Sequence, residues 1–92
     1  MDPIHVAGTD KGRVMLFALS TCGWCAKTKE LLNDLGVAYD YVFVDQLPKE
    51  EMERVYADMM KRYNPLGSFP TVVINGRVIV GYKEEDIREA LI

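Results

Sequence analysis

The sequence predicts an α/β fold in which a four-stranded mixed sheet is flanked by three helices. Short apolar runs alternate along the chain with segments whose apolar residues recur at helical spacing. The first two runs are close enough to the helical segment between them for a parallel βαβ crossover. The last two runs are joined by Asn75-Gly76, a pair typical of a type I′ hairpin turn. Together these features predict the element order βαβαββα.

Length and composition predict a single domain. The chain has 92 residues, fewer than the roughly 100 to 200 that one domain usually takes, so residues 1–92 have room for one compact unit. Its 49% hydrophobic and 27% charged residues match globular domains and exclude disordered or collagen-like chains. Residues 8–12 read Gly-Thr-Asp-Lys-Gly, and we expect residues 1–12 to form a loosely ordered lead-in.

Charge and hydropathy narrow the range of partners. Eleven Lys and Arg stand against fourteen Asp and Glu, for a net charge of -3, which lacks the basic footprint of a nucleic-acid binder. No apolar run approaches the roughly 20 residues that span a bilayer, and the first residues lack the pattern of a signal peptide. We therefore expect a cytoplasmic monomer with neither nucleic-acid nor membrane partners.

The first strand and helix are predicted between residues 14 and 36. Residues 14–19 form a continuous apolar run, too short for a helix, which indicates a buried central strand. Thr21 can cap the helix that follows, and Gly36 supplies its C-terminal stop. The buried face of this helix is indicated by Thr28, Leu31, Leu32 and Leu35. The two cysteines of the chain therefore lie at the N-terminus of this helix.

The later elements follow from similar patterns. Aromatic and β-branched residues at 37–45 indicate a second strand. A second helix opens at Pro48 and ends at Asn64-Pro65. Its inward face is formed by Met52, Val55, Tyr56, Met59 and Tyr63. Residues 71–74 and 77–80 are the strands of the hairpin, and the last helix buries Ile87, Ala90 and Leu91.

The segment Cys22-Gly23-Trp24-Cys25 indicates thiol chemistry. Two cysteines at this spacing are too few and too close to staple a secreted scaffold. Unpaired N–H groups and the positive end of the helix favour the thiolate of the first cysteine, the species that attacks disulfides. Cys22 is therefore predicted to be the nucleophile. Cys25 lies within one helical turn and below the surface, so we expect it to resolve the mixed disulfide formed on Cys22.

Other interpretations of these residues stay open. The two cysteines could be half of a zinc site, although four ligands are usual and His5 is the only other good one. They could also be inert core thiols. Trp24 could cover the core, but a residue between the two cysteines must lie near the surface, which favours a role in flanking the thiolate and meeting the partner.

The chain resembles the glutaredoxin and small thioredoxin-like family over roughly residues 13–91. The resemblance rests on the C-x-x-C motif after the first strand, on Ser68-Phe69-Pro70-Thr71, and on Val80-Gly81 before the last helix. It implies a thioredoxin-like, glutaredoxin-type fold. It also implies a cis peptide bond at Pro70, beside the cysteine pair, and pairing of the Phe69 backbone with the thiol substrate as if it were an extra strand. A trans turn proline is the alternative for Pro70.

The resemblance also suggests which residues bind substrate and where this chain departs from the family. The substrate-binding residues that we expect are Thr21, Gly23, Trp24, Phe69, Pro70, Gly81, Tyr82 and Lys83. Glutaredoxins typically carry Cys-Pro-Tyr-Cys and a basic residue three places before the first cysteine, where this chain has Leu19. Residues that hold the γ-glutamyl carboxylate look replaced by Lys83 and Glu84. Lys83 could pair with a carboxylate or sulfonate or be simply solvated, and Lys61 and Arg62 are weaker candidates.

The predicted function is thiol–disulfide oxidoreduction of protein disulfides or mixed disulfides by the cysteine pair. We expect no tightly bound cofactor and no metal, with a small thiol, glutathione or a substitute, as reductant. One alternative is a thioredoxin-like hydrogen donor that is recycled by a flavoprotein reductase. The other is a [2Fe-2S] carrier with Cys22 as ligand, since relatives without proline after the first cysteine can hold such a cluster between two protomers.

Overall fold

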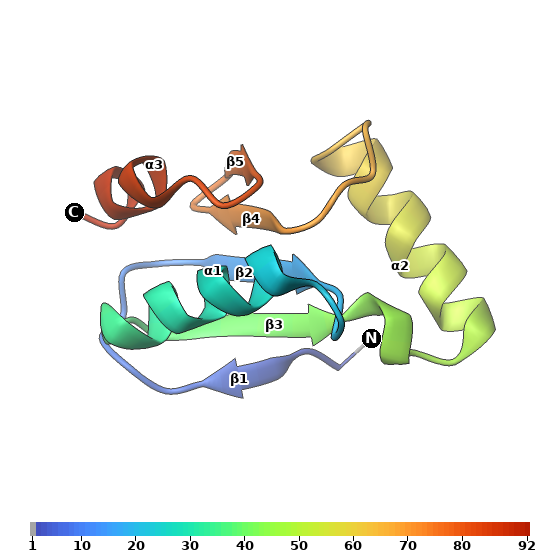
Figure 1. The fold of residues 1–92 in the computed structure, drawn as a ribbon, viewed down its shortest axis with the longest axis horizontal. Coiled ribbons are helices and arrows are strands. Elements are labelled where there is room, and N and C mark those ends of the chain that lie inside the picture. The colour runs from blue at the N-terminus through green and yellow to red at the C-terminus, as the bar shows by residue number, and fades with distance from the viewer. Residues whose placement is uncertain (1) are drawn as a thin grey trace.

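The computed structural model describes residues 2–92 (Figure 1). Its elements in chain order are β1 (Ile4–Val6), β2 (Val14–Ala18), α1 (Gly23–Asp34), β3 (Tyr39–Phe43), the 3-10 turn η1 (Val44–Gln46), α2 (Lys49–Arg62), β4 (Thr71–Ile74), β5 (Arg77–Val80) and α3 (Glu84–Ala90). The predicted α/β fold with three helices is confirmed. None of the helices in the described part of the chain is both long and apolar enough to cross a membrane.

The sheet is mixed, with strand order β1-β3-β2-β4-β5. The central strand β2 pairs in parallel with β3 and antiparallel with β4. The hairpin of β4 and β5 turns at Asn75 and Gly76, whose φ angles of 50° and 86° are both positive, as a type I′ turn requires. The strands predicted at 14–19, 71–74 and 77–80 are therefore in place.

The sheet has five strands rather than the predicted four. Residues 4–6, within the segment expected to be a loosely ordered lead-in, form β1 and pair antiparallel with β3. Thr9 bridges Val37 further along, and Gly8 lies so close to this backbone that a Cβ atom there would be 2.5 Å from the Val37 carbonyl carbon. The prediction missed β1 because three residues are too few to show the alternation of apolar and polar side chains that marks a strand. These residues are ordered by pairing with β3, which is distant in the sequence.

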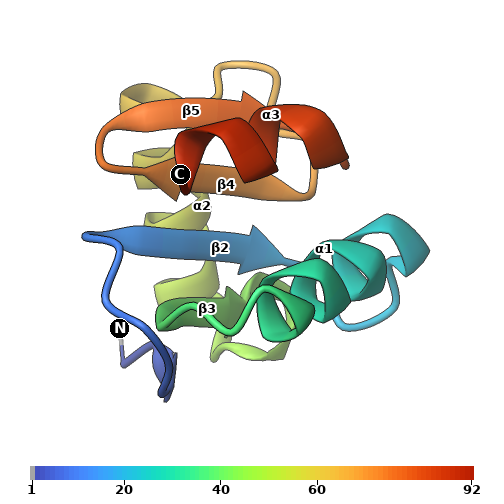
Figure 2. The same ribbon diagram turned by 90° about the vertical axis from the view of Figure 1, so that its left-hand side faces the viewer.

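Helices cover both faces of the sheet (Figure 2), with α1 and α3 on the near side and α2 behind. The apolar side chains of β2 alternate between the two faces. Leu16 packs into the core under α1 and α3, which also contains Leu32 and Ile87. Phe17 packs into a second core under α2, which also contains Met59. This two-sided burial explains why the segment at 14–19 has a continuous apolar run.

The topology brings two segments to one edge of the sheet. The end of β2 leads into α1, and Phe17, near that end, pairs with Thr71, the first residue of β4. Pro70 therefore lies beside the end of the strand that leads into the two cysteines. The helix N-cap is Cys22 and not Thr21, which is a correction of one residue to the predicted start of α1.

Candidate active site

Cys22 occupies the N-cap of α1 and is half-buried. Its backbone is extended, with φ -95° and ψ 117°, and its carbonyl accepts the first helical hydrogen bond from the Ala26 N–H at 3.1 Å. Its Sγ accepts a hydrogen bond from the Cys25 N–H at 3.2 Å. A sulfur in this position receives one of the otherwise unpaired N–H groups of the helix start, which stabilises negative charge on it.

Cys25 is only 1% exposed and packs into the core under α1. Burial raises the pKa of its thiol from 9.0 to about 12. The hydrogen bond with Cys22 and the charges of Cys22 and Asp45 raise the pKa further, while a backbone hydrogen bond with Leu19 lowers it. Cys25 is therefore a thiol at neutral pH, one turn beneath the half-buried sulfur of Cys22. The two cysteines do not form a disulfide in this structure.

A shallow cleft of about 240 Å³ opens beside Cys22. Its lining includes Leu19, Ser20, Lys29 and Phe43. Ser20, one of the lining residues, is held by Asp45, whose two carboxylate oxygens accept from the Ser20 N–H, at 2.9 Å, and from the Ser20 hydroxyl. These two bonds hold the pKa of the Asp45 carboxyl below its usual range. Sequence reasoning missed this pair, because Asp45 was only the polar end of a predicted strand.

The peptide bond between Phe69 and Pro70 is cis, as the family resemblance implied. Pro70 is buried and its carbonyl accepts a hydrogen bond from the Gly81 N–H at 2.8 Å. This contact ties the start of β4 to the segment after β5. Gly81 has φ 85°, in the left-handed region that glycine adopts without steric cost.

Asn64 holds the loop that carries Phe69 and Pro70. The Asn64 side chain is 1% exposed, and its Nδ2 donates to the Ser68 carbonyl and the Thr71 hydroxyl, both at 3.0 Å. Its Oδ1 accepts from the Leu66 N–H at 3.1 Å. The sequence indicated Asn64-Pro65 only as a helix end. Nothing local distinguishes an asparagine that ends a helix from one whose amide is buried in a loop.

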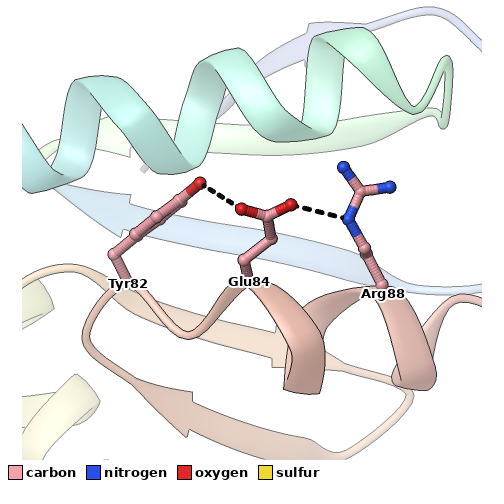
Figure 3. A network of polar contacts seen from close by, with 3 residues as sticks. All are labelled: Tyr82, Glu84 and Arg88. Carbon is pink, nitrogen blue, oxygen red and sulfur yellow. Dashed lines mark hydrogen bonds and ion pairs between the residues drawn. The ribbon is translucent and has the colours of Figure 1, made fainter.

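Trp24 and Tyr82 form an aromatic pair on the surface between α1 and α3. Their ring centroids are 5.7 Å apart and the rings are inclined by 21°. Trp24 is 60% exposed, so it does not cover the core. The Tyr82 hydroxyl donates to Glu84, and Glu84 also accepts from Arg88 (Figure 3). The sequence placed Trp24 and Tyr82 near the site but did not show that they stack or that Glu84 and Arg88 support them.

The remaining predicted residues are distributed as follows. Thr21 and Gly23 are exposed, and the space where a Cβ of Gly23 would lie is open. Lys83 is exposed at the N-cap of α3, adjacent to Tyr82. Lys61 and Arg62, the weaker candidates, lie at the end of α2 on the other face of the sheet, where Arg62 pairs with Asp58 at 3.1 Å. The structure does not bring these two residues to the cysteines.

The described part of the chain has no set of side chains placed to bind a metal ion. Residues 2–92 contain no group of three or more His, Cys, Asp or Glu placed to hold a metal ion. His5 pairs with Asp40 at 2.7 Å, between β1 and β3. An iron–sulfur cluster would have one half-buried sulfur available, that of Cys22, since Cys25 is buried. The described residues do not fit a zinc site, and the comparisons with known proteins below do not support the [2Fe-2S] cluster.

The sequence profile of the Glutaredoxin family matches residues 14–79, from β2 to β5. The chain belongs to the glutaredoxin family. A glutaredoxin from Methanosarcina mazei Go1 is 51% identical, with a TM-score of 0.87 over 97% of this chain and 86% of that one. Methanoredoxin from Methanosarcina acetivorans is 50% identical, with a TM-score of 0.86 over 91% of this chain and 88% of that one. The thioredoxin fold is thereby confirmed.

A more distant glutaredoxin has been solved with a small thiol. The buckwheat glutaredoxin–glutathione complex is 26% identical to this chain, with a TM-score of 0.68 over 83% of this chain and 68% of that one. Family membership and the fold identify the present glutaredoxin as a thiol–disulfide oxidoreductase with a C-x-x-C pair.

Proposed function

We propose that this glutaredoxin reduces protein disulfides or mixed disulfides by a two-cysteine mechanism in which Cys22 attacks and Cys25 resolves. The observation that carries the proposal is the asymmetry of the two sulfurs. Cys22 is half-buried at the helix start and accepts a hydrogen bond from the Cys25 N–H, whereas Cys25 is buried and its pKa is raised to about 12. A thiolate attacks disulfides and a thiol does not.

The proposed reaction balances as two thiol–disulfide exchanges. The Cys22 thiolate attacks one sulfur of the substrate disulfide, forms a mixed disulfide, and releases the other sulfur as a thiolate that takes up a proton. Cys25 then loses its proton and attacks Cys22 Sγ, which breaks the mixed disulfide and releases the second substrate thiol. Two electrons and two protons pass to the substrate, and the protein is left with a Cys22–Cys25 disulfide. Two molecules of a small thiol then reduce it.

The surface around Cys22 supports a role in substrate binding for the predicted residues. Phe69 is half-buried, and none of the hydrogen bonds between backbone groups outside the helices and strands of residues 2–92 uses its amide or carbonyl. That backbone is therefore free to pair with an extended substrate segment. Thr21, Gly23 and Trp24 are next to Cys22 at the start of α1, and Gly81, Tyr82 and Lys83 follow β5, where the Gly81 N–H donates to the Pro70 carbonyl.

For the reductant, we propose that a small acidic thiol other than glutathione supports turnover as well as glutathione or better. The buckwheat relative binds glutathione, but this chain has Leu19 in place of a basic residue and acidic residues after Lys83. The Lys83 side chain forms no hydrogen bond or ion pair within the described chain. Its ammonium is therefore available to a carboxylate or sulfonate, for which an exposed pair supplies roughly 0.2 to 1 kcal/mol.

Turnover of the two serine variants tests the proposal. Cys22→Ser should abolish reduction of every disulfide, while Cys25→Ser should still reduce small mixed disulfides and lose the reduction of protein disulfides. Retained activity in Cys22→Ser would overturn the assignment. The same assay, run side by side with glutathione, other small thiols and a flavoprotein thioredoxin reductase, identifies the source of electrons. Turnover with the flavoprotein alone would replace the small-thiol proposal by the hydrogen-donor alternative.

A further inference from the structure

Trp24 is held in place by side chains from another element. It lies on the first turn of α1 between the two cysteines, and its indole stacks on the Tyr82 ring at 5.7 Å. An indole that is 60% exposed would otherwise be free to change rotamer. Stacking on a neighbour restricts this freedom only if the neighbour is itself fixed.

Tyr82 is fixed by Glu84 and Arg88. The Tyr82 hydroxyl donates to Glu84 Oε1 at 3.1 Å, and Arg88 Nε donates to Glu84 Oε2 at 2.9 Å, so one carboxylate joins both side chains (Figure 3). The Arg88 hydrogen bond, with that of Tyr82, lowers the pKa of Glu84. Desolvation and the Glu84 hydrogen bond raise the pKa of Tyr82. At neutral pH Glu84 is therefore an acceptor and the Tyr82 hydroxyl a donor, as this chain of bonds requires.

These residues line a small cleft, of about 170 Å³, between α1 and α3. Lys27 and Glu30 of α1 line it as well. The contacts of Tyr82, Glu84 and Arg88 thus connect the last helix of the chain to the helix that carries the cysteine pair. The residues are positioning residues, since Glu84 and Arg88 reach the site only through Tyr82 and Trp24.

We propose that Tyr82, Glu84 and Arg88, here called the Trp24 clamp, hold the indole in one orientation beside Cys22, and that this fixed surface favours peptide and protein disulfides with an apolar or aromatic side chain next to the cysteine. This inference rests on the proposed function, because it names the partner class of the same dithiol. An aromatic surface that is already ordered binds such a side chain without the cost of ordering the indole. A small disulfide has no neighbouring side chain and gains nothing from the clamp.

Fluorescence gives a direct test of the clamp, because Trp24 is the only tryptophan of the chain. Time-resolved anisotropy of the reduced protein should show little independent motion of the indole. Tyr82→Phe and Glu84→Ala should increase that motion, and Glu84→Gln, which keeps an acceptor for Tyr82, should restore part of the restriction. Asp58→Ala is the matched control, because it breaks the Arg62 pair of the same i,i+4 spacing on α2. Unchanged anisotropy in Glu84→Ala would overturn the clamp.

Selectivity is measured in single turnovers of pre-reduced protein, which need no added reductant. Three uncharged substrates are compared: hydroxyethyl disulfide, a peptide disulfide with Phe beside each cysteine, and the same peptide with Ala in its place. Glu84→Ala should slow the Phe peptide by roughly two- to tenfold, the range that one aromatic contact contributes. The other two substrates should be unaffected, and Asp58→Ala should change none. Equal slowing of all three substrates would overturn the selectivity.

The experiments distinguish a failure of the Trp24 clamp from a failure of the proposed mechanism. Anisotropy of Trp24 requires no redox activity, so its outcome stands whichever cysteine attacks. Conversely, retained activity in Cys22→Ser would remove the proposed mechanism without altering the anisotropy result. If the clamp is present but the Phe peptide shows no preference over the Ala peptide in wild-type protein, the partner class is wrong.

Discussion

The side-chain amide of Asn64 donates a hydrogen bond to the hydroxyl of Thr71, with 3.0 Å between Nδ2 and Oγ1, and both residues are buried. Asn64 follows the end of α2 and Thr71 begins β4. The Thr71 hydroxyl in turn donates to the Ser68 carbonyl at 2.8 Å. The loop that presents Phe69 and Pro70 to the cysteine pair is thus closed by side chains at its two ends.

We therefore predict that Asn64→Ala lowers the free energy of unfolding by about 1 to 3 kcal/mol, because it leaves buried partners without their hydrogen bonds. Urea denaturation of the reduced protein measures the change. A double-mutant cycle with Thr71→Val should give a coupling of roughly 0.5 to 3 kcal/mol between the two residues. Additive effects would show that the two residues act independently.

A second prediction concerns the pH dependence of stability in the reduced protein. The pKa of Cys25 is raised from 9.0 to about 12 by burial, so above pH 9 the unfolded chain loses this proton while the folded protein keeps it. The contribution of Cys25 to the free energy of unfolding should therefore be fully present below about pH 9. The free energy of unfolding should then fall between pH 9 and pH 12, with a slope near 1.4 kcal/mol per pH unit for one proton.

Tyr39, whose pKa burial raises from 10.0 to about 12, adds to this loss only above about pH 10. Tyr82, whose pKa is also raised, acts in the same direction and in the same range, so the contribution of Cys25 dominates between pH 9 and pH 10. Denaturation at a series of pH values should show that Cys25→Ala lacks the decline in this interval. A decline of equal slope in wild type and Cys25→Ala would contradict the assignment to Cys25.

The third prediction concerns Lys83. Lys83→Glu should raise the apparent KM for a small anionic thiol several-fold, because it replaces an attractive charge by a repulsive one, and should leave the rate with protein disulfides nearly unchanged. Steady-state kinetics with each reductant measures this. Lys49→Glu, at the start of α2 on the other face of the sheet, makes the same change in net charge away from the site. Equal effects from the two variants would show that Lys83 acts through overall charge alone.

The fourth prediction tests the packing of the N-terminal segment. A Cβ at Gly8 would lie 2.5 Å from the Val37 carbonyl carbon, closer than packing allows. Gly8→Ala should therefore destabilise the protein by about 1 to 3 kcal/mol, measured by thermal or urea denaturation. Gly23→Ala is the control, since the space there is open. A Gly8→Ala variant as stable as wild type would mean that this segment does not pack against residues 36–38.

Much of the fold could be predicted because its signals are local. Residues 14–19 form a continuous apolar run because β2 is covered on both faces, and Asn75-Gly76 supplies the two positive φ angles of its turn. The strand β1 could not be predicted, since its three residues are ordered by pairing with β3. The N-cap differed by one residue because Cys22 itself takes the capping position.

In the candidate site, too, some residues could be predicted from local sequence signals and others depend on partners that the sequence does not reveal. Cys22 and Cys25 stand out in the sequence because a C-x-x-C pair at a helix start favours a reactive thiolate on the first cysteine. The residues that support them do not stand out. Asn64, Asp45 and Glu84 are ordinary polar residues in the sequence, and their roles in the structure depend on partners between two and twenty-five positions away.

The central claim, that Cys22 is the attacking sulfur and Cys25 the buried partner, is tested most directly by the order of alkylation. Reduced protein is treated with limiting iodoacetamide near pH 7, and tandem mass spectrometry locates the label within the peptide that contains both cysteines. We predict that Cys22 is labelled first and that Cys25 is labelled only after unfolding in denaturant. Preferential labelling of Cys25 in the folded protein, or labelling of both at the same rate, would contradict the assignment.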